Sequence, residues 1–142
     1  CLVPVLTVIL RSFRSVRKLP WPWAQESTLI VCAVPSDEYR VRERGIDHTD
    51  YLLRLVHEEL VPWATRSNLL RRKRSVKQNA SLPANELRHV NIQGVFAATG
   101  NIKGAVLLVD DVYTTGASWQ EAERVLKEAG ASCVYGFFFA KG

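Results

Sequence analysis

Two adjacent carboxylates follow a run of apolar residues, and a turn rich in hydroxyl side chains comes directly after them. The stretch VLLVDDVYTTGAS covers residues 106–118 and places Asp110 and Asp111 after four apolar residues. Carboxylates accept hydrogen bonds from sugar hydroxyls and hold Mg²⁺ through water. Because their charge repels phosphate, we expect them to bind a different part of the ligand from any phosphate group.

The residues after the two carboxylates favour a phosphate site. We expect a tight turn into a helix at Thr114, Thr115, Gly116, Ala117 and Ser118. The first N–H groups of a helix have no partner within it, and the helix dipole adds partial positive charge there. Gly116 lets the backbone approach a ligand closely. The segment therefore predicts a ribose, with its diol on the aspartates and its 5'-phosphate in the turn.

Other interpretations of this segment are a surface turn and a nucleotide-binding loop. In the first, Ser118 caps the helix and both aspartates face solvent. The second, a Walker-type loop, is excluded because the sequence has no Gly-Lys-Ser/Thr.

Composition and charge fit one compact domain with an anionic partner. The chain has 142 residues, of which 47% are hydrophobic and 23% charged. The formal net charge of +5 favours phosphorylated small molecules or nucleic acid without choosing between them. Cys32 and Cys133 lie in apolar runs and are expected to be buried, which fits a reducing cytoplasm.

Hydrophobic patterns predict strands that alternate with helices. Continuous apolar runs predict buried strands at residues 28–35, 105–110 and 132–140. Helical spacing predicts helices over residues 48–60 and 118–130, the second with Glu123 and Lys127 four residues apart. The fold class is therefore α/β, with a mostly parallel central sheet flanked by helices. In such a sheet ligands bind beyond the carboxyl ends of the strands, where Asp110 and Asp111 would lie.

Weaker patterns predict the remaining elements. We expect a helix over residues 3–18, short strands near 67–70 and 94–98, a mobile basic loop over 71–81, and a short helix over 83–90. The apolar run 2–10 is too short to cross a bilayer, and its arginines follow it, so we expect neither a membrane span nor a signal peptide.

Two parts of the chain are expected to differ in role. Residues 1–27 would form an N-terminal helix and a Pro/Trp-rich connector, and residues 28–142 one domain. The chain begins with Cys1 and contains no Met, so we expect a fragment that lacks an N-terminal part. The tryptophans of LPWPW, residues 19–23, either line an acceptor pocket or form a hydrophobic plug, and we favour the plug.

The 106–118 stretch resembles the phosphoribosyl pyrophosphate (PRPP) signature of type I phosphoribosyltransferases. That signature has four apolar residues, two acidic ones, two further residues, and Thr-Thr-Gly-x-Thr/Ser; here Ser118 stands in place of the commoner Thr. VPSDEYRVRERGIDH at 34–48, LLRRKRSVKQ at 69–78 and NELRHVNIQGVFAA at 85–98 are similar to stretches of the competence-protein ComF family. The chain departs from that family's pattern at Ala33 and at residues 46–48.

The resemblance, which covers about residues 28–142, implies a Rossmann-like type I phosphoribosyltransferase fold and activity. The enzyme would bind PRPP with Mg²⁺, transfer the 5-phosphoribosyl group to an acceptor and release pyrophosphate. Asp110 and Asp111 would be catalytic and would also be candidates to hold Mg²⁺, and residues 114–118 would bind the 5'-phosphate. Pyrophosphate would be bound by Arg40, Arg42 and Arg44, and a flexible loop would close over PRPP with Arg71, Arg72, Lys73, Arg74 and Lys77.

The alternative is a non-catalytic PRPP-binding module with a regulatory or nucleic-acid-associated role. ComF-like proteins are associated with DNA uptake in natural competence, so the basic run would contact single-stranded DNA or a competence-machinery partner. No aromatic residue lies between Trp63 and Phe96, so base stacking within the basic run is not supported. A solvated basic loop is the third interpretation. The acceptor, and whether the chain forms a homodimer, stay open.

Overall fold

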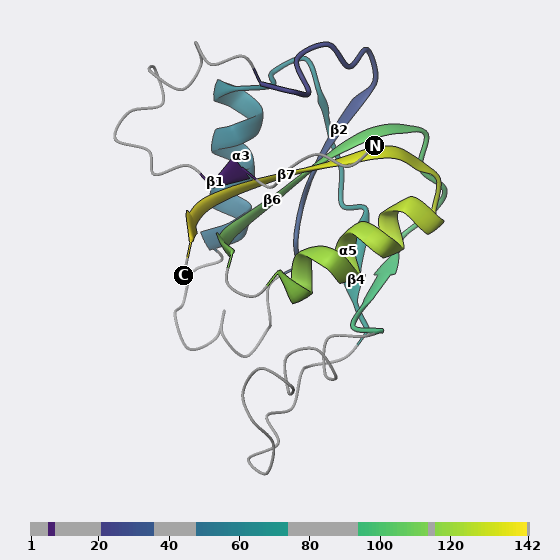
Figure 1. Cartoon of the computed structure of the whole chain (residues 1–142). Helices are drawn as coiled ribbons and strands as arrows, with labels where there is room; N and C mark the ends of the chain where they lie inside the picture. Colours follow the sequence, from purple (N-terminus) through teal and green to yellow (C-terminus); the bar gives the residue numbers. More distant parts are fainter. Residues whose placement is uncertain (1–5, 8–20, 36–47, 74–93, 114–115, 142) are drawn as a thin grey trace.

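A parallel sheet of five strands, in the order β1-β7-β6-β2-β3, forms the centre of the computed structural model (Figure 1). The structure describes residues 6–7, 21–35, 48–73, 94–113 and 116–141. The strands of this sheet are β1 (Leu6–Thr7), β2 (Leu29–Ala33), β3 (Thr65–Arg66), β6 (Gly104–Tyr113) and β7 (Ala131–Lys141).

The central strands are apolar on both faces because both faces of the sheet are covered. In β6, Val106 and Leu108 pack into one core cluster, and Ala105, Leu107 and Val109 pack into another. This alternation follows from the two-residue period of a strand. A strand buried on both sides needs a continuous apolar run, which is the pattern that identified β2, β6 and β7 in the sequence.

One helix covers each face of the sheet (Figure 1). Helix α3 (His48–Glu59) packs Leu53 and Val56 against Leu107 and its neighbours. Helix α5 (Ala117–Glu128) packs against the opposite face through an apolar stripe with four buried residues: Trp119, Ala122, Val125 and Leu126. The unit β2–α3–β3 runs toward one edge of the sheet, and the unit β6–α5–β7 runs toward the other edge. Because such connections share one handedness, units that run in opposite directions place their helices on opposite faces.

A small antiparallel sheet lies on the α5 side. Strand β4 (Leu70–Arg72) pairs with β5 (Phe96–Ala98), with Arg72 opposite Phe96. Leu70 and Phe96 belong to the same core cluster as Trp119 and Leu108. The two-stranded sheet is therefore attached to the main sheet through apolar contacts on the α5 face.

Glycine ends helix α5 and permits the turn into β7. Gly130 has a φ of 116°, and a Cβ at this position would lie 2.5 Å from the carbonyl oxygen of Ile102. That backbone is held close because the Ile102 N–H donates to the Ala129 carbonyl at 2.9 Å. A left-handed conformation and this close approach both require glycine here.

The α/β class with a parallel sheet is confirmed, and the main elements lie where the sequence predicted them. Helix α5 begins one residue before its predicted start, and β6 continues three residues past its predicted end. The Glu123–Lys127 ion pair forms at 2.7 Å, and Cys32 and Cys133 are buried, as predicted.

Three local predictions are wrong. Leu6 and Thr7 form a strand beside β7 where a helix was predicted, because backbone pairing with Phe137 and Phe138 replaces helical bonds. The single strand near 67–70 is replaced by β3 and β4. Arg71 and Arg72 lie in β4, whereas we expected the basic loop to begin at residue 71. The rest of the predicted 3–18 helix and the 83–90 helix lie outside the described residues.

The tryptophans before β2 pack as a hydrophobic plug. Trp23 is 1% exposed and stacks on Trp21 with ring centroids 4.8 Å apart. Both rings meet Phe137 of β7 edge-on. The side chains therefore cover the α3 face of the sheet, as the plug interpretation predicts.

In the described part of the chain, no helix has the length and apolar character needed to cross a membrane.

Candidate functional site

The strand order reverses between β2 and β6, and the candidate site lies at the carboxyl ends of these two strands. From β2 the chain passes through α3 to β3 on one side, and from β6 it passes through α5 to β7 on the other. In open α/β sheets such a reversal leaves a crevice at the carboxyl ends, because the flanking connections diverge. Ala33 pairs with Val109 at the point where β2 ends.

Asp110 and Asp111 lie immediately beyond this last pair. Strand β6 continues to Tyr113 alongside β7, with Asp110 opposite Phe138, while β2 ends at Ala33. The sequence analysis expected the strand to end at Asp110, with both aspartates at its carboxyl end, whereas the strand continues three residues further, to Tyr113. Strict alternation would place the two side chains on opposite sides of β6, but the Asp111 carboxyl group lies within hydrogen-bonding reach of the Asp110 carboxyl group.

The two carboxyl groups are coupled. The backbone N–H of Asp111 donates to Oδ1 of Asp110 at 2.8 Å. Burial, and then the neighbouring Asp111 carboxyl, raise the pKa of Asp110 to about 8. The backbone bond from Asp111 and the positive charge of Arg72 act in the opposite direction. At neutral pH the Asp110 carboxyl group is therefore mostly protonated.

The start of α5 is free of negative charge. Gly116 is the N-cap residue, in a left-handed conformation with φ of 80°, and no side chain caps the helix. The first turn contains no acidic residue, so no carboxylate within that turn neutralises the partial positive charge of the helix end. Gly116 rather than Ser118 is the cap, which argues against the surface-turn interpretation on that point.

Arg72 is the basic residue that the structure brings to Asp110. Its Nε donates to the carbonyl of Pro35, two residues beyond the end of β2, at 3.0 Å. The guanidinium carbon lies 5.3 Å from the centre of the Phe96 ring. Arg71 and Lys73, its neighbours, are exposed. The structure therefore separates residues that the sequence had grouped in one flexible loop.

The remaining predicted site residues lie outside the described part of the chain: Thr114, Thr115, Arg40, Arg42, Arg44, Arg74 and Lys77. Their roles stay predictions. Ala117 and Ser118 lie in the first turn of α5, because the helix begins one residue earlier than predicted.

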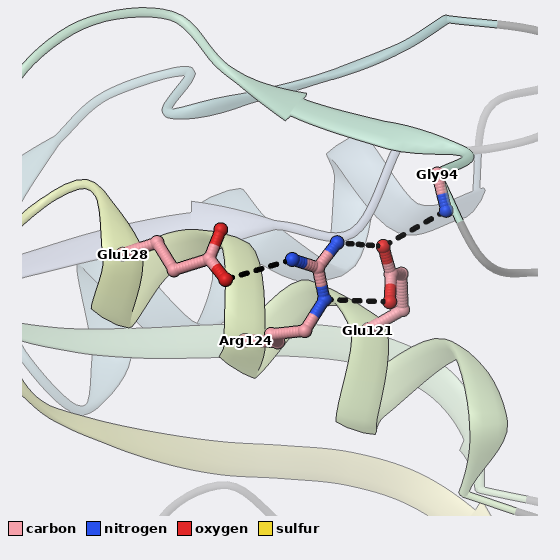
Figure 2. Close-up of polar contacts among 4 residues, drawn as sticks. All are labelled: Gly94, Glu121, Arg124 and Glu128. Atoms are coloured by element: carbon pink, nitrogen blue, oxygen red, sulfur yellow. Dashed lines mark hydrogen bonds and ion pairs between the residues drawn. The ribbon is translucent and has the colours of Figure 1, made fainter.

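Glu121 is a structural residue near the site that the sequence analysis missed. Its carboxylate is 6% exposed and accepts from the Gly94 N–H at 3.0 Å and from both Nε and Nη2 of Arg124 (Figure 2). The bonds from Arg124, the largest effect, hold the pKa of Glu121 below its usual range. The only sequence signal was an arginine three residues after a glutamate on the edge of an apolar stripe.

The chemistry of this arrangement suits a polar ligand that carries negative charge at some distance from its hydroxyl groups. Among the described residues, no three His, Cys, Asp or Glu side chains are grouped to hold a metal ion. The two aspartates alone fit a Mg²⁺ ion that takes its other ligands from water and from substrate oxygens. Comparisons with protein-family models, with curated proteins and with solved structures found no match for this chain.

Proposed function

We propose that this chain is a PRPP-binding phosphoribosyltransferase of the ComF type. It transfers a 5-phosphoribosyl group to an acceptor and releases pyrophosphate. The observation that carries the proposal is the position of the 106–118 signature. Its two aspartates lie at the carboxyl end of β6 where the strand order reverses, and its Gly116 begins α5.

Each part of the site is given a role that suits its charge. The start of α5 binds the 5'-phosphate through backbone N–H groups. Asp110 and Asp111 hold the ribose diol, and a carboxylate of this pair stabilises the positive charge that develops on the ring as the C1–O bond to pyrophosphate breaks. The end of β2 lies on the other side of the aspartates and would meet the diphosphate. Bound Mg²⁺ would neutralise diphosphate charge.

A protonated Asp110 helps this acidic pair to bind an anionic substrate. A neutral Asp110 donates one hydrogen bond and accepts others, so it suits a ribose hydroxyl group, which also does both. It adds no negative charge near the phosphates. The proposal therefore links the raised pKa of Asp110 to ligand binding.

Calorimetric titration of Mg²⁺–PRPP tests this function directly. The wild-type chain is compared with the Asp110→Asn/Asp111→Asn double variant, and Asp50→Asn on the exposed surface of α3 controls for loss of a carboxylate. We expect binding by the wild type and by Asp50→Asn, and a loss of at least tenfold in affinity in the double variant. Equal binding by all three would refute the assignment of the aspartates.

Turnover requires a second measurement because the acceptor is open. Bases and amines are screened for PRPP-dependent release of pyrophosphate, and the active acceptor is tested with Asp110→Asn alone. We expect a decrease in turnover of two orders of magnitude or more in a protein that remains folded. Unchanged turnover in Asp110→Asn would exclude a catalytic role for this residue.

A second candidate is a non-catalytic PRPP-binding module that contacts nucleic acid. The observation that favours it is the exposure of Arg66 in β3 and of Arg71 and Lys73 at β4. The test is the salt dependence of affinity for single-stranded DNA, in the wild type and in Arg71→Gln/Lys73→Gln. Loss of two phosphate contacts should reduce the slope of log K against log salt by about 1.4. Exposed Lys103, at the opposite end of the sheet, supplies the control Lys103→Gln.

A further inference from the structure

Arg72 joins three parts of the fold at the open end of the sheet. It lies on β4, bonds through Nε to the carbonyl of Pro35 at 3.0 Å, and packs over Phe96 of β5. Its charge also acts on Asp110 of β6. Pro35 directly follows the buried Val34, whose N–H donates to the Val109 carbonyl at 2.9 Å. Arg72 therefore holds the backbone just after β2 next to the part of β6 that carries Asp110 and Asp111.

The strand geometry explains why Arg72, and not its neighbours, has this position. Side chains alternate along β4, so Arg71 and Lys73 face solvent while Arg72 is half-buried. The guanidinium lies over the Phe96 ring and still directs a donor at a carbonyl, which a lysine ammonium does not do in the same geometry.

Glu121 of α5 fixes the strand on which Arg72 rests. Its Oε1 accepts from the Gly94 N–H, two residues before Phe96, and Arg124 holds the same carboxylate (Figure 2). The next residue, Val95, accepts from the Lys73 N–H at 2.7 Å. A continuous set of bonds thus runs from α5 through Gly94 and β4 to Pro35.

We propose that Arg72 is a positioning residue of this site. It fixes the carboxyl end of β2 opposite Asp110, so that the diphosphate of a ribose-phosphate substrate meets a backbone that is already in place. This inference rests on the proposed function. It assigns Arg72 to a packed strand position, in place of the closing loop to which the sequence had assigned it. Preorganised backbone lowers the ordering cost of binding, so loss of the bond should weaken diphosphate binding in particular.

The test compares Arg72→Met with Arg71→Met. Methionine keeps an unbranched stem over Phe96 and removes the donors and the charge, while Arg71→Met makes the same change on the exposed face of β4. Hydrogen exchange of the Val34 amide reports on the end of β2, and exchange of the Leu108 amide reports on the centre of the sheet. Titrations use Mg²⁺–PRPP and, separately, ribose 5-phosphate, which lacks the diphosphate.

In Arg72→Met we expect hydrogen exchange of the Val34 amide to be at least tenfold faster than in the wild type, and exchange of the Leu108 amide to be unchanged. We also expect at least tenfold weaker PRPP binding, with ribose 5-phosphate affinity within twofold of wild type. Arg71→Met should match wild type in all four measurements. A purely structural role would instead accelerate exchange at both amides and weaken both ligands alike, and that result would overturn the inference.

A second variant keeps the inference testable if Arg72→Met fails to fold. Arg72→Lys keeps the charge but lacks the Nε donor, so we expect faster Val34 exchange and a threefold or greater loss of PRPP affinity. Wild-type values for both in Arg72→Lys would overturn the inference while the proposed function stands. A wild-type chain that binds neither ligand would reject the proposed function itself, and with it the role of Arg72.

Discussion

Asp110 combines a buried position with a like charge beside it, and both effects favour its protonated form. Its pKa in the folded chain is about 8, against an ordinary value of 3.8. The folded state therefore binds more protons than the unfolded state over this interval. The stabilising contribution of the protonated Asp110 to the free energy of unfolding is present in full below about pH 4, and it is lost as the pH rises toward and through 8.

Asp110→Asn should remove this pH dependence. Asparagine keeps the shape and the hydrogen bonds of the side chain but has no charge to bury. We therefore expect the free energy of unfolding of the variant at pH 8 to be higher than that of the wild type by on the order of 1–2 kcal/mol. Urea unfolding at several values between pH 5 and pH 9 measures the effect, and Asp50→Asn should retain the wild-type slope. A variant whose stability falls with pH as steeply as that of the wild type would place the titrating group elsewhere.

Glu121 is the opposite case, since its buried charge has partners. Glu121→Ala leaves the Gly94 N–H without its acceptor and Arg124 without its bidentate partner. We expect a loss of about 2–3 kcal/mol in the free energy of unfolding. Glu128→Ala removes the exposed partner of the same arginine and should cost less than about 0.5 kcal/mol. Similar losses in the two variants would contradict the role given to burial.

At the scale of elements, the sequence predicted those strands and helices whose burial requires a regular pattern of apolar residues. Strands β2, β6 and β7 are buried on both faces and read as apolar runs, and α3 and α5 show helical spacing. Strand β5 lies within the short strand predicted near 94–98, but its pairing with β4 and the pairing of β1 with β7 join distant residues, which no local pattern records. The pairing of Arg72 with Phe96 belongs to the same class, so the signature aspartates were identified but the contact beside them was not.

Gly136 shows how closely α5 is packed on β7. A Cβ at this position would lie 2.8 Å from Cζ3 of Trp119 and 2.9 Å from the Phe138 ring. Gly136→Ala should therefore displace α5 and lower stability by about 1–3 kcal/mol. Gly100→Ala is the matched control, because nothing lies within 4 Å of its added Cβ. Denaturant unfolding gives the stabilities, and near-ultraviolet circular dichroism reports on the Trp119 environment. Equal stabilities in the two variants would mean that the helix shifts without cost.

At the scale of the whole molecule, one sheet carries two cores. Consecutive residues of β6 enter different cores: Leu107 packs toward α3 and Leu108 toward α5, and both are fully buried. Each face also has a buried tryptophan, Trp23 on the α3 side and Trp119 on the α5 side. Since both cores share the same backbone, loss of either one removes the support of the other. Both faces should therefore unfold in a single transition.

Leu107→Ala and Leu108→Ala test this coupling. Each leaves a cavity in one core and should lower the free energy of unfolding by about 3 kcal/mol. Labelling with 5-fluorotryptophan lets ¹⁹F NMR follow Trp23 and Trp119 separately through urea unfolding. We expect the two signals to shift to lower urea together in both variants, because β6 transmits the loss to the opposite face. If Leu108→Ala moved the Trp119 transition and left that of Trp23 in place, the two faces would be separate folding units. The aspartates at the end of β6 would then depend on the stability of only one of them.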